Sequence, residues 1–138
     1  MAGFNYNEVF TILKAKMGKS YPACKVDRYI TPKESQMPYM DVALADLSGG
    51  HYSLSGEEGS QNPLLTLTVY ATGSLADNTC SQISEKAKAI MLEYGWQCKS
   101  GPLPVPNATN PNIVRWVSRY QRVVASGDNL LLPVKFSS

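Results

Sequence analysis

The sequence is poor in the residues that most enzyme active sites require. It contains one histidine, His51, with no cysteine or carboxylate at ligand spacing, so it predicts neither a zinc site nor a catalytic triad. The adjacent acids Glu57 and Glu58 lie in the same glycine-rich stretch, where a flexible chain does not preorganise an acid–base pair. No glycine cluster matches a phosphate-binding loop or a dinucleotide fingerprint. We therefore expect no catalytic residues, no metal site, no cofactor and no enzymatic activity.

Long apolar runs, paired cysteines and an excess of charge are missing as well. No run approaches the roughly 18 apolar residues of a membrane-spanning helix, and residues 1–8 lack the basic and apolar regions of a signal peptide, so we expect none. The three cysteines, Cys24, Cys80 and Cys98, fit no disulfide framework and no metal-ligand spacing, which favours buried free thiols. The net charge of +2 is too small to indicate a nucleic-acid or membrane partner. Charged residues make up 17% of the chain, below the usual quarter or so, which fits a surface partly covered in an assembly.

Apolar residues at helical spacing predict two helices. The first covers residues 5–17, with an asparagine near its start to cap it and Gly18 to end it. The second covers residues 76–94 and ends at Gly95. Its predicted core stripe falls at positions i, i+4, i+7, i+8 and i+11 and consists of Ile83, Ala87, Ile90, Met91 and Tyr94.

Alternating apolar residues predict short strands at residues 24–30, 38–45, 64–71 and 96–100. Two segments are predicted as loops. Residues 46–62 are rich in glycine and show no apolar period, which indicates a long hairpin loop. Residues 101–111 contain four prolines and are also expected to be loop.

A longer strand is predicted at residues 112–125, which are dense in β-branched and aromatic residues and free of glycine and proline. Side chains alternate between the two faces of a strand. One face is expected to be core: Val114, Trp116, Ser118, Tyr120, Arg122 and Val124. The other mixes apolar and polar residues and is expected to be only partly dry: Ile113, Arg115, Val117, Arg119, Gln121 and Val123.

These elements predict an α+β domain at residues 1–125, with a mostly antiparallel sheet of four to five strands and two helices packed on one face. Residues 126–138 form a predicted C-terminal arm. The arm is apolar but too short to build a core, so it is expected to dock on this domain or on a neighbouring subunit. Its candidate contact residues are Leu130, Leu131, Leu132 and Phe136.

The basic and aromatic residues of the long strand leave a second interpretation open. Arg115, Arg119 and Arg122, together with Trp116 and Tyr120, could form a platform for nucleic acid. Alternatively, the two aromatic residues belong to the core and the arginines are surface or interface charges. The split of the arginines between the two strand faces favours the second interpretation.

Three sequence features together resemble the tail terminator (tail completion) proteins of long-tailed bacteriophages. They are the helix end Glu93-Tyr94-Gly95-Trp96, the proline- and asparagine-rich connector at residues 101–107, and the strand end Ser118-Arg119-Tyr120-Gln121-Arg122-Val123-Val124. Asn62-Pro63 and Thr68-Val69-Tyr70 also fall where that family has strands and loops. The resemblance covers residues 21–124.

The resemblance implies a structural virion protein without enzymatic activity. Such a subunit forms a ring, commonly a homohexamer, at the head-proximal end of the tail tube. The ring ends tube polymerisation and offers a surface for head–tail joining, so the implied partners are other copies of the chain, the tail tube protein and the head–tail connector proteins. Genomic DNA would pass through the lumen, no membrane is involved, and assembly would occur in the host cytoplasm. Candidate interface residues are Arg115 and Arg119 of the strand, the apolar arm, and His51, Glu57 and Glu58 of the glycine-rich loop.

Other functions remain as alternatives. Another neck component, such as a head-completion or connector-joining protein, would also form a small ring. A small nucleic-acid-binding module would use the arginines of the long strand. A small enzyme with an unrecognised site is the third alternative.

Overall fold

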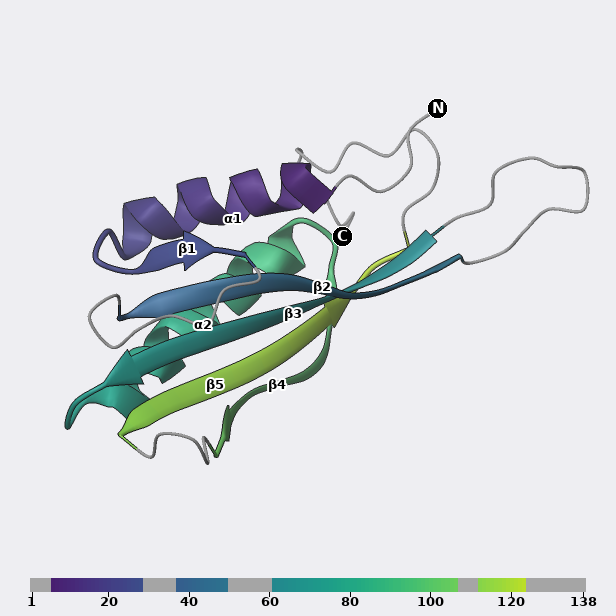
Figure 1. Ribbon diagram of the computed structural model, residues 1–138. Coiled ribbons are helices and arrows are strands. Elements are labelled where there is room, and N and C mark those ends of the chain that lie inside the picture. Colours follow the sequence, from purple (N-terminus) through teal and green to yellow (C-terminus); the bar gives the residue numbers. More distant parts are fainter. Residues whose placement is uncertain (1–5, 29–36, 50–60, 107–111, 124–138) are drawn as a thin grey trace, which may run out of the picture.

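The computed structural model describes residues 6–28, 37–49, 61–106 and 112–123 (Figure 1). In chain order the elements are α1 (Tyr6–Ser20), β1 (Lys25–Asp27), β2 (Tyr39–Gly49), β3 (Gln61–Thr72), α2 (Ala76–Glu93), β4 (Gln97–Val105) and β5 (Ile113–Gln121). This is the predicted succession of a helix, three strands, a helix and two strands.

The five strands form one sheet in the order β1-β2-β3-β5-β4. Three neighbouring pairs are antiparallel, whereas β1 and β2 are parallel. The predicted α+β class with a mostly antiparallel sheet is therefore confirmed, and the sheet is mixed. Residues 28–38 separate β1 from β2, which is more than a tight hairpin needs and allows the chain to return in the parallel direction.

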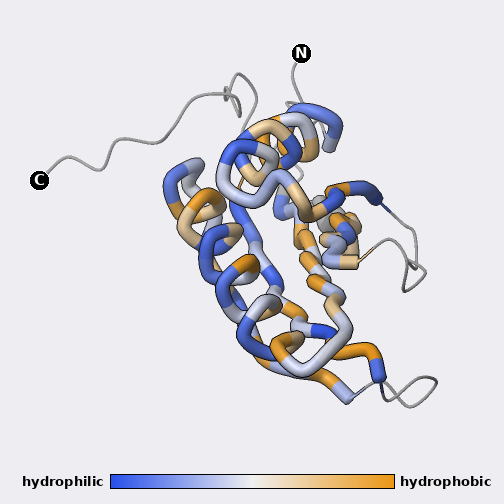
Figure 2. The backbone as a smooth tube through the Cα atoms, turned by 90° about the vertical axis from the view of Figure 1, so that its left-hand side faces the viewer, coloured by the Kyte–Doolittle hydropathy of each residue, from blue (hydrophilic) through white to orange (hydrophobic). Residues whose placement is uncertain are grey.

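Both helices pack on the same face of the sheet and enclose one core. Seen end-on, they lie to one side and across the top of the strands (Figure 2). The predicted stripe of α2 is buried throughout, and α1 contributes Val9, Leu13 and Met17. The sheet contributes Met40 and Val42 of β2, Leu65, Leu67 and Val69 of β3, and Tyr120 of β5, each at most 1% exposed. On the predicted core face of β5, Ser118 and Tyr120 are buried, while Val114 and Trp116 are half-buried and pack against the core.

Two predicted boundaries near the N-terminus were wrong. Gly18 does not end α1, which continues to Ser20, and the amide of Tyr21 still donates to the Met17 carbonyl at 2.7 Å. In the predicted strand at 24–30, residues 25–27 form β1, residues 24 and 28 do not belong to it, and residues 29–30 lie outside the described residues. A glycine inside the last turn of a helix costs about 1 kcal/mol relative to alanine, which the packing of α1 on the sheet can offset.

The predicted loop at residues 46–62 was wrong at both ends. The β2–β3 ladder continues to the pair Gly49–Gln61, with an irregularity between Leu44 and Asp46. Pairing between two long neighbouring strands therefore overrides the weak local preference of this glycine-rich segment for strand.

The predicted loop at residues 101–111 was wrong over its first half, where residues 101–105 belong to β4. Proline in a sheet is largely confined to edge strands, strand starts and bulges, and β4 lies at the edge of the described sheet, beside β5. The ladder is interrupted between Cys98 and Ser100 and again between Ser100 and Leu103. These irregularities accommodate Gly101, whose φ of +78° favours glycine.

The second helix ends as predicted. Tyr94 is its C-cap, and Gly95 follows with φ of +88°, the left-handed conformation common after helices. Neither helix, among the described residues, is long and apolar enough to cross a membrane.

Candidate interface on the open face of the sheet

One face of the sheet carries no helix among the described residues, and we call it the open face. Strand alternation and register place these side chains opposite the core residues of β2, β3 and β5. Three cross-strand rows define the open face: Tyr39–Tyr70–Arg115, Asp41–Thr68–Val117 and Ala43–Thr66–Arg119.

The first row contains the most buried residue of the three rows. Tyr39 is only 2% exposed, and Tyr70 and Arg115 are half-buried. Burial raises the pKa of Tyr39 to about 12, and the nearby carboxylates of Asp27 and Asp41 add to this shift. Burial and Asp41 also raise the pKa of Tyr70, while Arg115 acts in the opposite direction. Both phenols therefore stay protonated at physiological pH, and the buried Tyr39 hydroxyl makes no hydrogen bond within the described part of the chain.

Arg115 is held by Tyr70, with which it shares a side-chain hydrogen bond, and by the end of β4. Its Nη2 donates to the carbonyl oxygen of Pro106 at 3.0 Å, which fixes the guanidinium against the end of β4. Its Nε is buried and makes no hydrogen bond. Arg119, at the other end of the face, is exposed. The open face thus has one ordered and one solvated cation, separated by the half-buried Val117.

Surfaces of this composition suit contacts between proteins. Half-buried valine, threonine and tyrosine side chains supply apolar area, and the arginines supply charge-assisted hydrogen bonds. The edge of the face is bounded by β4, where Leu103 is 62% exposed and Val105 half-buried. These two residues pair with Val117 and Arg115 and extend the apolar area across a fourth strand.

The other face of β5 shows where the aromatic residues of the alternative nucleic-acid platform lie. Tyr120 is fully buried, and Trp116 packs against the core with its Nε1 donating to Asp77 Oδ1 at 3.1 Å. Arg122 reaches the end of α2, where its Nη1 donates to the carbonyl oxygen of Tyr94 at 2.6 Å. The ring of Tyr120 is therefore not available for stacking on bases, and its interpretation as a core residue is confirmed. Trp116 is half-buried and packs against the edge of the core.

The remaining predicted interface residues lie outside the described residues. They are His51, Glu57 and Glu58 of the glycine-rich loop and Leu130, Leu131, Leu132 and Phe136 of the arm. The predicted arm at residues 126–138 likewise stays a prediction.

The thiols are placed largely as predicted. Cys24 and Cys80 are buried and free, and Cys98 is free but only half-buried. Burial raises the pKa of Cys24 to about 11 and of Cys80 to about 12, so both are protonated and unreactive at neutral pH. Within the described ranges, no three histidine, cysteine or acidic side chains are grouped so that they could hold a metal ion.

The tyrosines of the open face were not identified from the sequence. Tyr39 and Tyr70 are far apart in the chain, and only the β2–β3 register brings them beside Arg115. Alternation within the strand at residues 38–45 could have placed Tyr39 opposite Met40, but the sequence does not reveal the pairing partner. No protein-family model matches the chain, and no curated protein matches it.

Proposed function

We propose that the protein is a structural subunit of a phage tail, which forms a ring at the head-proximal end of the tail tube. The ring ends tube polymerisation and provides the surface for joining the head. The observation that supports this function is the open face, an ordered surface with half-buried apolar side chains and two arginines that no described element covers. One of its strands, β5, includes part of the strand end at residues 118–124 that carries the resemblance to tail terminators.

A surface of this kind can serve as a contact between neighbouring subunits of a ring. Each subunit in a cyclic assembly offers two different patches to its two neighbours. In this proposal, the open face is one patch, and the apolar arm at residues 126–138 is a candidate for the other. The protein would then reside in the neck of the virion, with the genome passing through the lumen of a hexamer.

The first test is the solution mass of the purified protein by light scattering after size exclusion. A mass near six subunits, or a monomer that assembles only on added tail tubes, supports the proposal. A monomer that binds neither tail tubes nor filled heads would overturn it.

Deletion of the chain from Leu130 onward tests the role of the arm. We expect a folded protein that no longer assembles, because the arm lies beyond the last strand of the core. A truncated protein that keeps the full ring mass would exclude the arm as a subunit contact.

Shortening residues 50–60 tests the glycine-rich loop with His51, Glu57 and Glu58. Ring mass should stay unchanged while joining of heads to tails falls. If joining persists, the loop is not the contact with tube or connector.

The alternative within the same class is another neck component, such as a head-completion protein. Binding of the purified protein to filled heads rather than to tail tubes would favour it. A nucleic-acid module is less well supported, since Trp116 and Tyr120 pack in the core; it predicts DNA affinity that falls steeply with salt.

A further inference from the structure

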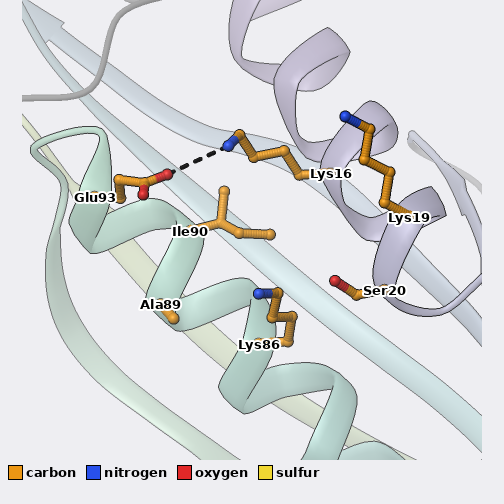
Figure 3. A pocket seen from close by; sticks show the side chains of 7 residues that line it. All are labelled: Lys16, Lys19, Ser20, Lys86, Ala89, Ile90 and Glu93. Atoms are coloured by element: carbon orange, nitrogen blue, oxygen red, sulfur yellow. Dashed lines mark hydrogen bonds and ion pairs between the residues drawn. The ribbon is translucent and has the colours of Figure 1, made fainter.

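A basic groove lies between α1 and α2, on the side of the sheet away from the open face. It has a volume of about 250 Å³ and is lined by Lys16, Lys19, Ser20, Lys86, Ala89, Ile90 and Glu93. The two helices meet here from distant parts of the sequence. Figure 3 shows the Lys86 ammonium and the Ser20 hydroxyl both reaching toward the space between the helices.

The charges in the groove are unbalanced. Three lysines and one glutamate give a formal charge of +2 (three minus one). Lys16 pairs with Glu93 at 3.4 Å between Nζ and Oε1, and its ammonium also lies 5.5 Å from the centre of the Tyr94 ring. Within the described part of the chain, Lys19 and Lys86 have no ion-pair partner. Two ammonium groups are therefore available to an incoming anion.

The floor of the groove is aliphatic. Ile90 is almost fully buried and Ala89 is exposed beside it, one turn along α2 from Lys86. The methylene stems of the lysines add apolar area around a charged rim, as long basic side chains commonly do. A ligand for this groove needs both negative charge and an apolar group.

We propose that this groove binds an acidic segment of a protein partner. Carboxylates of the segment pair with Lys19 and Lys86, and an apolar side chain between them lies on Ala89 and the methylene stems of the lysines. The contact between Lys16 and Glu93 shows that a carboxylate fits this environment. Nucleic acid is a poorer match, because the described lining contains neither an arginine nor an aromatic ring for stacking, and Glu93 repels a phosphate backbone. The site does not depend on ring formation, since one chain supplies all of it.

The test uses the full-length protein and a fluorescein-labelled peptide of sequence Glu-Glu-Leu-Glu-Glu, with binding followed by fluorescence anisotropy at low salt. Lys86→Glu and Lys19→Glu should each weaken binding by about tenfold or more. Lys99→Glu makes the same change of charge on exposed β4, outside the groove, and should change affinity less than about twofold. Circular dichroism and the melting temperature of each variant check that the fold is retained.

Glu93→Gln provides an independent test, because it should strengthen peptide binding where the lysine substitutions weaken it. It removes the one carboxylate that competes for Lys16, so the peptide should bind several-fold more tightly. Equal losses in the Lys86→Glu and Lys99→Glu variants would show a general charge effect and overturn the proposal. A labelled oligothymidine serves as the competing ligand. If it binds more tightly than the peptide, and Lys86→Glu abolishes its binding, the groove is a nucleic-acid site and the proposal is overturned.

Discussion

Gly101 shows how a single residue permits the geometry of β4. Its φ is +78°, and a Cβ atom built at this position would lie 2.2 Å from the carbonyl oxygen of Val117 on the neighbouring strand. Backbone atoms cannot move aside as a flexible side chain can. The close approach of β4 to β5 next to Arg119 therefore depends on the absence of a side chain at position 101.

Gly101→Ala should accordingly lower the free energy of unfolding by about 2 kcal/mol or more, from strain in the left-handed region plus the clash. Urea unfolding followed by circular dichroism measures this change. Gly18→Ala is the matched control, because position 18 lies inside α1 with nothing within 4 Å of the added Cβ. It should stabilise the protein by up to about 1 kcal/mol. Equal effects of the two substitutions would contradict the role assigned to Gly101.

The two buried thiols predict a loss of stability in alkali. Burial raises the pKa of Cys24 to about 11 and of Cys80 to about 12, from an ordinary value of 9.0. Above about pH 9 the unfolded chain releases these protons while the folded chain keeps them, so the free energy of unfolding falls as pH rises. The expected slope is up to about 1.4 kcal/mol per pH unit for each thiol.

Urea unfolding at intervals between pH 8 and pH 10 measures this slope. A variant carrying Cys24→Ala and Cys80→Ala should be less stable at every pH, because it loses packed side chains, but its stability should depend less on pH. An unchanged slope in that variant would assign the alkaline effect to other groups. Tyr39 and Tyr120, whose pKa values burial raises to about 12, contribute above about pH 10.

At the scale of elements, β5 holds α2 at both ends. Trp116 donates to Asp77 in the first turn of the helix, and Arg122, just beyond β5, donates to the carbonyl of Tyr94 at its last turn. Between them, the Cys80 thiol lies 3.4 Å from the carbonyl oxygen of Val69. These contacts fix the position of α2 against the centre of the sheet. They therefore also fix one wall of the basic groove.

Arg122→Met keeps the aliphatic stem and removes the guanidinium. The hydrogen bond to Tyr94 is partly exposed, so its loss should cost about 1 kcal/mol. The effect should be local, with faster hydrogen exchange at the amides of Tyr94, Gly95 and Trp96, measured by NMR. Arg119→Met, on the opposite face of the strand, is the control and should leave those amides unchanged. If these amides exchange at the same rate as in the unmodified protein, or more slowly, Arg122 does not hold the end of α2.

Elements with strong local periodicity could be predicted from the sequence, whereas elements that depend on tertiary contacts could not. The stripe of α2 and the core face of β5 follow directly from residue spacing. The strand character of residues 101–105 does not, because prolines suppress local strand preference and only the edge position of β4 makes them acceptable. The basic groove could not be predicted for a different reason. Lys16 and Lys86 line it from two different helices, and no local sequence pattern shows how those helices pack.

At the scale of the whole molecule, the two sides of the sheet offer different surfaces. The helix side presents the basic groove with its aliphatic floor, and the open face presents tyrosine, valine and arginine side chains. A subunit with two unlike surfaces can contact a neighbour through one and a different partner through the other. The proposed ring therefore predicts that changes to the open face affect assembly, while changes to the groove do not.

Arg119→Glu tests this separation. Arg119 is exposed, so the substitution should leave the fold and melting temperature nearly unchanged, but reversing a charge in a subunit contact should weaken assembly by about tenfold or more. Light scattering over a dilution series measures the shift from ring to monomer. Lys88→Glu on α2 makes the same change of charge on the helix side and should retain the ring. If the ring survives Arg119→Glu but is lost in Lys88→Glu, the subunit contact lies on the helices. The open face would then be a surface for the tail tube or the connector.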